Sequence, residues 1–286
     1  MGPAGFLNVL DQIPSLLKKK PPDVLYHYTS QRGLLGIIEK KKLWATHIRY
    51  LNDSTEFDYP LESARKLLCK ERDSSDERRA QFAEKALAQL NSSLDINTAF
   101  TVYVASFSRN RNQLSQWRGY CTHGSGFSVG FRVSNLRNLV ERRSNDFDLA
   151  FVPCLYRKED QNALISELIS RAITVPTNTS AEVLFVLSIL RWAPAIKHKK
   201  FEEEAEWRLV ARGVRDDSSF RERHSFLIPY VEFDLTSKDR KGIDCIKSVT
   251  VGPTSYPKLS EQSVKDLLSK HGVDNCKTSC SGIPLR

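Results

Sequence analysis

The segment from Leu25 to Lys40 constrains the fold most, because it predicts a strand that runs directly into a helix. The strand, residues 25–29, brings His27, with a tyrosine on either side, to the mouth of the helix. Ser30 is a good N-cap for that helix. Four apolar residues then follow at helical spacing: Leu34, Leu35, Ile37 and Ile38. A histidine beside a helix N-terminus lies where a phosphate-bearing ligand is easily bound, although His27 is equally compatible with a place in the core or on the surface.

The length and composition are those of an ordinary globular chain. With 286 residues, the chain can form one large domain or two smaller domains with a real core. No apolar run approaches the roughly 18 residues that span a bilayer. The basic cluster Lys18–Lys20 follows the apolar part of the N-terminus, which is the reverse of the order in a secretory signal. We therefore expect a cytoplasmic protein with no membrane partner.

The six cysteines are widely scattered, and only Cys276 and Cys280 lie close together. Their spacing fits neither a zinc ribbon nor a thioredoxin-type pair, and no Cys/His pair has the spacing of metal ligands. We expect reduced thiols and no metal.

The net charge of +9 and the isoelectric point near 9.2 indicate an anionic partner. Nucleic acid, a phosphorylated ligand and an acidic protein all fit this charge. Basic runs occur at Lys18–Lys20, Lys40–Lys42 and Lys197–Lys200, but such runs are most often solvated helix ends. Charge alone therefore predicts affinity for polyanions without selecting one.

Strands and helices follow one another without regular alternation, which favours an α+β fold over a doubly wound parallel sheet. We expect a basic, amphipathic segment at 1–23 and a single α+β domain at 24–286, with a helical insertion at 158–198. Helices are expected at 55–71, 77–90, 135–142, 158–173, 180–198 and 259–271. Strands are expected at 43–46, 99–108, 127–132, 150–156, 206–212, 225–233, 246–251 and 274–279. Pro194 should kink its helix or end it early.

Glu204 and Glu206 form the first candidate site. They are two residues apart, so on an extended chain they share one face, and Trp207 occupies the other. Two carboxylates on one face can stabilise a cationic transition state, as in the cleavage of a glycosidic bond. They can equally form a charged strand edge that discourages aggregation. Glu206 enters a strand that looks central, so it is harder to interpret as part of a solvated turn than the preceding glutamates, and both interpretations stay open.

The second candidate site is the segment Ser115–Tyr120, which leads to a glycine-flanked turn ending at Gly126. Trp117 and Tyr120 could form a stacking platform for a nucleobase or a nicotinamide ring. Packing in the core is the competing interpretation, and it fits Trp117 better than Tyr120. No nucleophile elbow surrounds Ser115, and the chain has neither a P-loop nor a dinucleotide-binding fingerprint. Hydrolase, kinase and Rossmann interpretations therefore lose support.

Several of these motifs together are similar to a bacterial family of unknown function, the domain-of-unknown-function family numbered 2971. The motifs are Leu-Tyr-His-Tyr-Thr-Ser at 25–30, Leu-Trp-Ala at 43–45, Tyr-Leu-Asn-Asp-Ser-Thr-Glu-Phe at 50–57, Phe-Ser at 107–108, Ser-Gln-Trp-Arg-Gly-Tyr at 115–120, Gly-Phe-Ser-Val-Gly-Phe at 126–131, Glu-Ala-Glu-Trp-Arg at 204–208 and Val-Gly-Pro at 251–253. More distantly, the layout is similar to the ADP-ribosyltransferase superfamily. That resemblance implies a split, mostly antiparallel sheet core with added helices, and NAD as a substrate.

The resemblance also implies roles for individual residues. His27 would hydrogen-bond an NAD ribose, and Glu206 would bind the nicotinamide ribose and stabilise the developing oxocarbenium ion. Glu204 would assist the acceptor nucleophile. Tyr120, and less surely Tyr28, would stack on nicotinamide. The remaining residues of the expected NAD-binding site are Thr29, Trp117, Arg118 and Gly126.

The leading hypothesis is an NAD-consuming ADP-ribosyltransferase or NAD glycohydrolase, a toxin or antiphage effector that acts on DNA, RNA or a protein. It needs no metal. It does require that His27 and Glu206 face each other across one dinucleotide-sized hollow. The acceptor and the oligomeric state stay open.

Two alternatives belong to other classes of protein. In a non-catalytic nucleotide or nucleic-acid sensor, His27, Arg49 and Arg118 would bind phosphate, and Glu206 would pair with an arginine such as Arg208 or Arg118. In a metal-dependent nuclease, the ligands would be Asp53, Glu56 and Glu204. Asp53 and Glu56 fit helix-start chemistry better, since carboxylates in the first turn of a helix stabilise its dipole.

Overall fold

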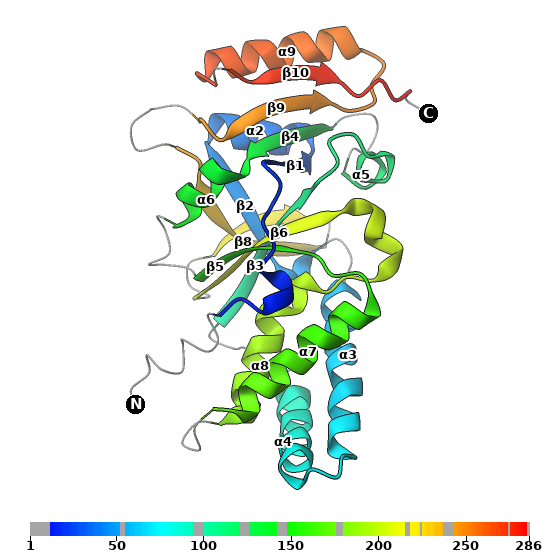
Figure 1. Ribbon diagram of the computed structural model, residues 1–286. Helices are drawn as coiled ribbons and strands as arrows, with labels where there is room; N and C mark the ends of the chain where they lie inside the picture. The colour runs from blue at the N-terminus through cyan, green and yellow to red at the C-terminus, as the bar shows by residue number, and fades with distance from the viewer. Residues whose placement is uncertain are drawn as a thin grey trace.

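The computed structural model describes residues 12–51, 55–93, 100–120, 126–141, 148–175, 180–214, 218–223, 225–236, 243–273 and 275–284. These residues fold into a mostly antiparallel, ten-stranded open sheet with helices packed around it (Figure 1). The main order of strands is β10-β9-β4-β1-β3-β2-β8-β7, and β6 and β5 branch from β3. Among the named strands of this part of the chain, only β9 and β10 pair in parallel.

The strands are β1 (Val24–Thr29), β2 (Lys42–His47), β3 (Phe100–Ser108), β4 (Phe127–Arg132), β5 (Asp148–Pro153), β6 (Glu206–Val214), β7 (Ser219–Arg223), β8 (Phe226–Asp234), β9 (Ile246–Val251) and β10 (Lys277–Cys280). The α-helices are α2 (Gln31–Glu39), α3 (Thr55–Arg72), α4 (Glu77–Ser93), α5 (Leu114–Tyr120), α6 (Val133–Glu141), α7 (Lys158–Ile173), α8 (Ala181–Trp192) and α9 (Pro257–Lys270). Three of the 3-10 helices matter below: η2 (Ile48–Tyr50), η4 (Ala193–Ala195) and η5 (Lys199–Glu204).

The expected mixture of helices with a mostly antiparallel sheet is confirmed. Ser30 caps α2, and its hydroxyl accepts a hydrogen bond of 3.2 Å from the Gly33 amide. Helix α8 ends at Trp192, two residues before Pro194, as the missing amide of proline requires. Two elements were not predicted, the short helix α5 and the edge strand β7. The expected strand at 274–279 lies at 277–280, and residue 274 is outside the described part of the chain.

The sheet forks at strand β3. Along one edge, β3 pairs with β6 over its whole length. On the other edge, β2 pairs with Tyr103 and Val104, and β1 pairs with Ser108. Strands β1 and β2 therefore leave β3 at different heights and diverge, which places Ser106 in the fork between them.

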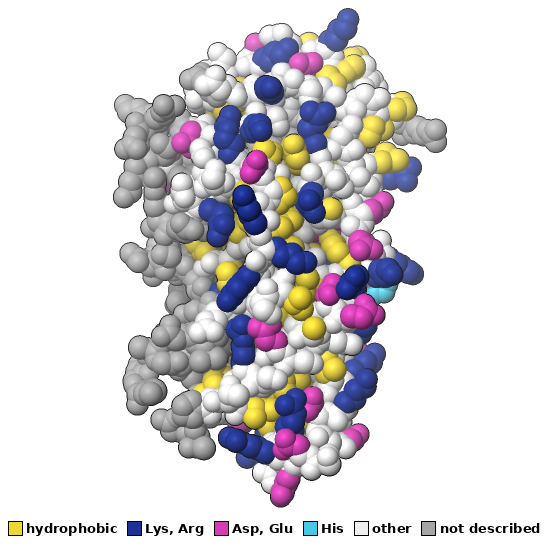
Figure 2. Space-filling view, in the orientation of Figure 1, with side chains coloured by type: hydrophobic (Ala, Val, Ile, Leu, Met, Phe, Trp, Pro, Cys, Tyr) yellow, Lys and Arg dark blue, Asp and Glu magenta, His cyan; other side chains and the backbone are white. Residues whose placement is uncertain are grey.

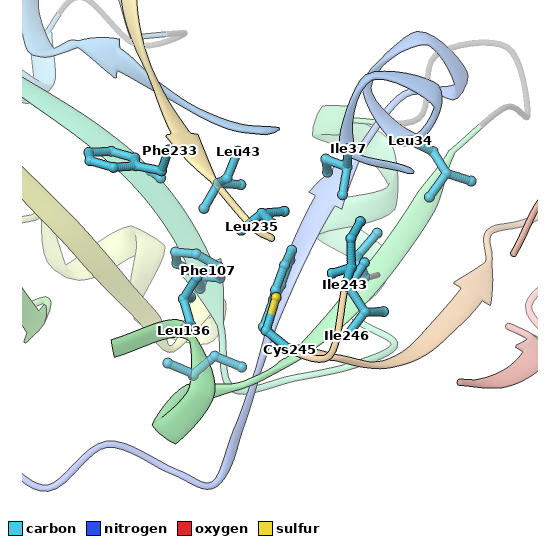
Figure 3. Close-up of a cluster of buried hydrophobic side chains, with 14 of the residues drawn as sticks. Leu34, Ile37, Leu43, Phe107, Leu136, Phe233, Leu235, Ile243, Cys245 and Ile246 are labelled. Carbon is cyan, nitrogen blue, oxygen red and sulfur yellow. The ribbon is translucent and has the colours of Figure 1, made fainter. Parts of the chain in front are cut away.

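Two hydrophobic clusters cover the two faces of the sheet, because successive side chains of a strand point to opposite faces. Tyr103, Ala105 and Phe107 belong to one cluster, and Val102 and Val104 belong to the other. The first cluster includes side chains from α2, α6 and β8 (Figure 3). The second lies among α3, α4, α7 and α8, the helices in the lower half of Figure 1. Polar side chains of neighbouring strands can therefore contact each other only where they point to the same face of the sheet.

Candidate functional site

A small pocket opens where β1, β3 and β6 meet the helix α5. Its hollow measures about 240 Å³, including the space at its open mouth. Tyr26, Ser108 and Glu206 are direct cross-strand partners, so their side chains share one face of the sheet. The full lining consists of Tyr26, Tyr28, Ser106, Phe107, Ser108, Gln116, Tyr120, Glu204 and Glu206. Three chain segments that are far apart in the sequence therefore build this pocket together.

Glu204 and Glu206 both reach the pocket, but not because the backbone between them is extended. Glu204 ends the 3-10 helix η5, Glu206 begins β6, and Ala205 between them has a left-handed conformation with φ of 43°. The Ser108 hydroxyl donates a 2.7 Å hydrogen bond to the Glu204 carbonyl, and the Arg109 amide donates one of 3.1 Å to the Ala205 carbonyl. These bonds hold a turn that is otherwise unfavourable for a residue other than glycine.

Below the pocket, Glu206 is the centre of a buried ion cluster. The Arg208 guanidinium contacts Glu206 Oε1 through Nε at 2.7 Å and Glu206 Oε2 through Nη2 at 3.0 Å. The Lys197 ammonium lies 2.7 Å from Glu206 Oε2 and 3.0 Å from Glu56 Oε1. Arg208 Nη2 also lies 2.6 Å from Glu56 Oε2. Lys197 reaches Glu204 Oε2 as well, so three carboxylates surround two cations and leave one formal negative charge.

The cluster fixes the protonation of its buried members. Burial alone would raise the pKa of Glu206, but Arg208 and Lys197 outweigh it and lower this pKa to about 2. Burial would likewise lower the pKa of Lys197, yet Glu206 and Glu56 raise it well above its ordinary range. Glu206 therefore stays ionised and Lys197 stays protonated at neutral pH, and neither group can exchange a proton with a ligand.

Glu204 differs from Glu206 in both exposure and protonation. The Glu204 side chain is 19% exposed against 6% for Glu206. Partial burial raises the pKa of Glu204, and contact with Lys197 only partly offsets that effect. Within the described part of the chain, a hydrogen bond reaches Glu204 Oε2 but none reaches Oε1. Glu204 is therefore the carboxylate of the cluster that can still accept a hydrogen bond from a ligand.

Tyr120 forms a side wall of the pocket. The residue as a whole is 38% exposed, whereas burial raises the pKa of its hydroxyl, and the carboxylate of Glu206 raises it further. The ring therefore faces solvent on one side while its hydroxyl reaches toward the carboxylates. Tyr120 is the residue for which the sequence predicts stacking on a ligand, and its ring lines the pocket.

His27 lies outside this pocket, which corrects the expectation that it faces Glu206. Tyr26 is level with Ser108 and Glu206, so the next residue, His27, points to the opposite face of β1. Its Nδ1 lies 2.9 Å from the Ser106 carbonyl oxygen in the fork, and its ring lies 5.8 Å from that of Phe107. Burial lowers the pKa of His27, and the neighbouring Arg221 lowers it further. His27 is a neutral group that fills the fork of the sheet.

Trp117, another residue of the expected NAD-binding site, is packed in the core of the protein. Trp117 is 2% exposed; its ring meets that of Tyr28 edge-on at 4.7 Å, and its indole nitrogen donates a 2.7 Å hydrogen bond to Asn112. A Cβ atom on Gly252 would lie 2.9 Å from this indole, so the Val-Gly-Pro motif supports Trp117. Trp117 is thus a core residue that positions Tyr28, which corrects its expected role as a stacking platform.

Three further expected residues do not line the pocket. A Cβ atom on Gly33 would lie only 1.9 Å from the hydroxyl oxygen of Thr29. Thr29 therefore packs against the start of α2. Gly126 accepts the amide hydrogen bond of Gly252 at 2.8 Å. Arg118 is exposed on α5. Tyr28 does line the pocket, and its hydroxyl donates a 2.7 Å hydrogen bond to the Asn110 carbonyl.

Lys197 and Tyr26 are members of the site that the sequence does not predict. Lys197 belongs to a basic run, and no sequence signal separates a buried lysine from its solvated neighbours. Glu56 is expected in helix-start chemistry or, in the nuclease hypothesis, as a metal ligand beside Glu204, whereas its carboxylate pairs with Arg208 and Lys197. Tyr26 could have been found, because it alternates with Tyr28 and therefore shares its face. The pairing of Glu206 with Arg208, which was expected for the sensor hypothesis, is present.

Fold and site together define a mixed α/β protein with a carboxylate-lined pocket beside a forked antiparallel sheet. A family model described as "Protein of unknown function (DUF2971)" matches residues 116–209, and this match supports the resemblance to that family. The matched segment contains Tyr120, Lys197, Glu204, Glu206 and Arg208. No curated protein and no solved structure matches the chain. None of the described helices is both long and apolar enough to cross a membrane.

Proposed function

We propose that the pocket binds the nicotinamide and ribose end of NAD, and that the protein breaks the bond between them. The observation that carries this proposal is the charge below the pocket, where three carboxylates are balanced by only two cations. The nicotinamide ring of NAD is a cation, and positive charge moves onto the ribose when it leaves. A preorganised negative charge stabilises both the cationic nicotinamide ring and the positive charge that develops on the ribose. This stabilisation is larger where water is excluded.

His27 has no part in this proposal, because it lies in the fork of the sheet and not in the pocket. The proposal therefore replaces the form in which His27 and Glu206 face each other across one hollow.

The residues that line the pocket have the following roles. Glu206, held by Arg208 and Lys197, supplies a fixed charge that needs no reorganisation during the reaction. Glu204 accepts a hydrogen bond from a ribose hydroxyl or from the incoming nucleophile. The exposed ring of Tyr120 stacks on nicotinamide, and Tyr26 also lines the pocket.

The reaction is a substitution at the anomeric carbon. The bond from that carbon to the nicotinamide nitrogen breaks, and its electron pair goes to the nitrogen. The nucleophile, water or an acceptor group, forms the new bond and loses one proton. The products are neutral nicotinamide and ADP-ribose, either free or attached to the acceptor.

The small size of the hollow limits how much of NAD it can enclose. Sites for whole small-molecule ligands occupy roughly 300–1,000 Å³, whereas the 240 Å³ of this hollow includes the open space at its mouth. We therefore assign only the nicotinamide riboside end to it. The pyrophosphate and adenosine would extend outward, past the exposed Arg109 and Arg111 in the loop between β3 and α5. An anionic phosphate inside the pocket would be repelled by the carboxylates.

A second candidate is a sensor that binds a nucleotide without turnover. The observation in its favour is that Arg208 and Lys197 satisfy both oxygens of Glu206, as in a structural ion cluster. The nuclease hypothesis is weaker, because Lys197 lies between Glu56 and Glu204 where a metal would have to sit. Among the described residues, no group of three or more potential ligands could hold a metal ion. Asp53 lies outside the described residues.

The test is release of nicotinamide from NAD by the purified protein, with Glu204→Gln as the variant and Glu202→Gln as its matched control. Glu202 lies in the same 3-10 helix and is exposed. We expect release by the native protein, a loss of about 100-fold in Glu204→Gln, and native release in Glu202→Gln. Saturable binding of NAD without release would favour the sensor, and neither binding nor release would reject both.

A further inference from the structure

A second polar region lies at the far edge of the sheet, on β2, β7 and β8. Its members are Trp44, Tyr50, Arg221, Arg223, Phe226 and Tyr230, and we call it the basic-aromatic face. Strand β7 ends the order of strands, and most of its residues are exposed. This edge was not predicted from the sequence and takes no part in the carboxylate pocket.

Arg221 is the central cation of the basic-aromatic face. Its Nη2 donates a 2.9 Å hydrogen bond to the Thr46 hydroxyl, and its guanidinium lies 5.7 Å from the Trp44 ring centre and 6.0 Å from that of Tyr230. Burial lowers the pKa of Arg221, and the nearby Arg223 lowers it further. No carboxylate of the described residues forms an ion pair with it. Glu232, the acid beside Trp44, accepts the indole hydrogen bond at 3.1 Å.

This arrangement is unusual for a partly buried charge. Charged groups removed from water are normally paired, because desolvation otherwise destabilises the charged form. Arg208 obeys this rule with two carboxylates, whereas Arg221 has aromatic rings, a hydroxyl and another arginine around it. An anion bound over Arg221 would supply the missing opposite charge.

The neighbouring rings add a second requirement to the ligand. Phe226 is 46% exposed, its ring lies 5.8 Å from that of Tyr50, and the Arg223 guanidinium lies 5.4 Å from its centre. Arg49, in the same 3-10 helix as Tyr50, is exposed. An exposed aromatic ring among arginines can stack on a base while the arginines contact its phosphates.

The overall charge does not locate a partner by itself. Figure 2 shows Lys and Arg side chains spread along the length of one face, with acidic and apolar side chains among them. What distinguishes the basic-aromatic face is the desolvated Arg221 among aromatic rings. A small inorganic anion would satisfy the charge but not use the exposed ring of Phe226.

We propose that the basic-aromatic face binds single-stranded nucleic acid, with Arg221 and Arg223 on phosphates and Phe226 stacked on a base. Binding itself does not depend on the function proposed for the carboxylate pocket. Only its extension, that the bound strand is the acceptor of ADP-ribose, rests on that function.

The experiment measures the anisotropy of fluorescein-labelled 12-nucleotide single strands, one DNA and one RNA, and of the corresponding duplexes, between 50 and 300 mM salt and without NAD. The variants are Arg221→Gln and Phe226→Ala. The matched control is Arg78→Gln, which makes the same substitution at an exposed position on α4. Thermal unfolding of each variant verifies that it is folded. If Arg221→Gln does not fold, the test relies on Phe226→Ala.

We expect saturable binding of at least one strand, with Kd raised about tenfold or more by Arg221→Gln and about tenfold by Phe226→Ala. Arg221→Gln should also reduce the slope of log K against log salt by about 0.7, the loss of one phosphate contact on a single strand. Arg78→Gln should bind as the native protein does. Absence of saturable binding at 50 mM salt, equal weakening by Arg221→Gln and Arg78→Gln, or tighter binding of the corresponding duplex would overturn the proposal. Because no turnover is measured, failure here leaves the test with NAD unaffected.

Discussion

Two arginines in the same sheet, Arg208 on β6 and Arg221 on β7, have opposite electrostatic surroundings. Arg208 is 2% exposed and contacts Glu56 and Glu206, and these carboxylates raise its pKa. Arg221 is partly buried, no carboxylate of the described residues pairs with it, and its pKa is lowered by burial. Both cations are at least partly removed from water, but in the part of the chain that the structure describes only Arg208 is paired with carboxylates.

Buried charge therefore occurs in two different forms in this molecule, one compensated by carboxylates and one not compensated by any described carboxylate. Around Arg208, three carboxylates pair with two cations, and the net charge of one negative unit lies beside the pocket. Around Arg221, the net charge is positive and lies on the strand that ends the sheet. The two proposals therefore assign a cationic ring to one place and a polyanion to another, a separation that the net charge of +9 alone would not indicate.

The largest effect should come from removing Arg208. Arg208→Ala leaves Glu206 and Glu56 buried near a single cation, and breaking such a cluster typically lowers the free energy of unfolding by about 3–5 kcal/mol. Arg221→Ala should change that free energy by less than about 1 kcal/mol, because no carboxylate loses its partner. Urea unfolding of both variants measures the contrast. Equal losses would mean that Arg221 is as firmly integrated as Arg208.

The next effect is a decline of stability in acid that occurs in two windows. The pKa of His27 is lowered on folding, so the stability it contributes is complete above its ordinary value of 6.5 and is lost as the pH falls below that value. The pKa of Glu206 is lowered to about 2, so its contribution is lost between its ordinary value of 4.5 and about 2. Unfolding free energy as a function of pH measures both windows.

Each window has its own control. His27→Asn should remove the first decline, and Glu206→Gln should remove the second. A native profile that is flat between pH 6.5 and 4.5 would mean that His27 is solvated. Glu204 should act in the opposite sense, because its pKa is raised and its protonation favours the folded state.

A smaller effect is expected at neutral pH from His27→Asn. The substitution removes the hydrogen bond to the Ser106 carbonyl and the ring contact with Phe107, so we expect a loss of about 1–2 kcal/mol. Thermal or urea unfolding at pH 7.5 measures it. If His27→Asn lowered the free energy of unfolding as much as Arg208→Ala, His27 would contribute as much to stability as the ion cluster does, which would contradict this prediction.

The smallest predicted effect concerns the turn between the two glutamates. Ala205→Gly should raise the free energy of unfolding by about 0.5–1 kcal/mol, since glycine adopts the left-handed conformation without the Cβ penalty. Ala211→Gly in β6, where the chain is extended, is the comparison and should destabilise instead. Stabilisation by both substitutions would contradict the turn geometry.

The sequence predicted elements well where local chemistry decides them. Ser30 has a cap hydroxyl followed by an apolar helical stripe, and Phe127–Arg132 alternates, so both elements lie where they were expected. Strand β7 was missed, because an exposed edge strand such as Ser-Phe-Arg-Glu-Arg has no buried face to mark its period.

The site was harder to predict than the fold, because it depends on register and burial. A strand pattern shows that His27 and Tyr26 face opposite ways, but not which of them will be level with Glu206. That depends on the pairing of Tyr26 with Ser108 and of Ser108 with Glu206, between segments about 80 and 100 residues apart. The burial of Lys197 likewise depends on carboxylates from three different elements.

Release of nicotinamide from NAD by Glu204→Gln and His27→Asn, compared side by side, tests the account most directly. Glu204 lines the pocket, whereas His27 lies in the fork of the sheet on the opposite face of β1. We therefore predict that Glu204→Gln loses about 100-fold of the release rate, while His27→Asn stays within a few-fold of the native protein. Loss of release in a folded His27→Asn, with release retained in Glu204→Gln, would contradict it.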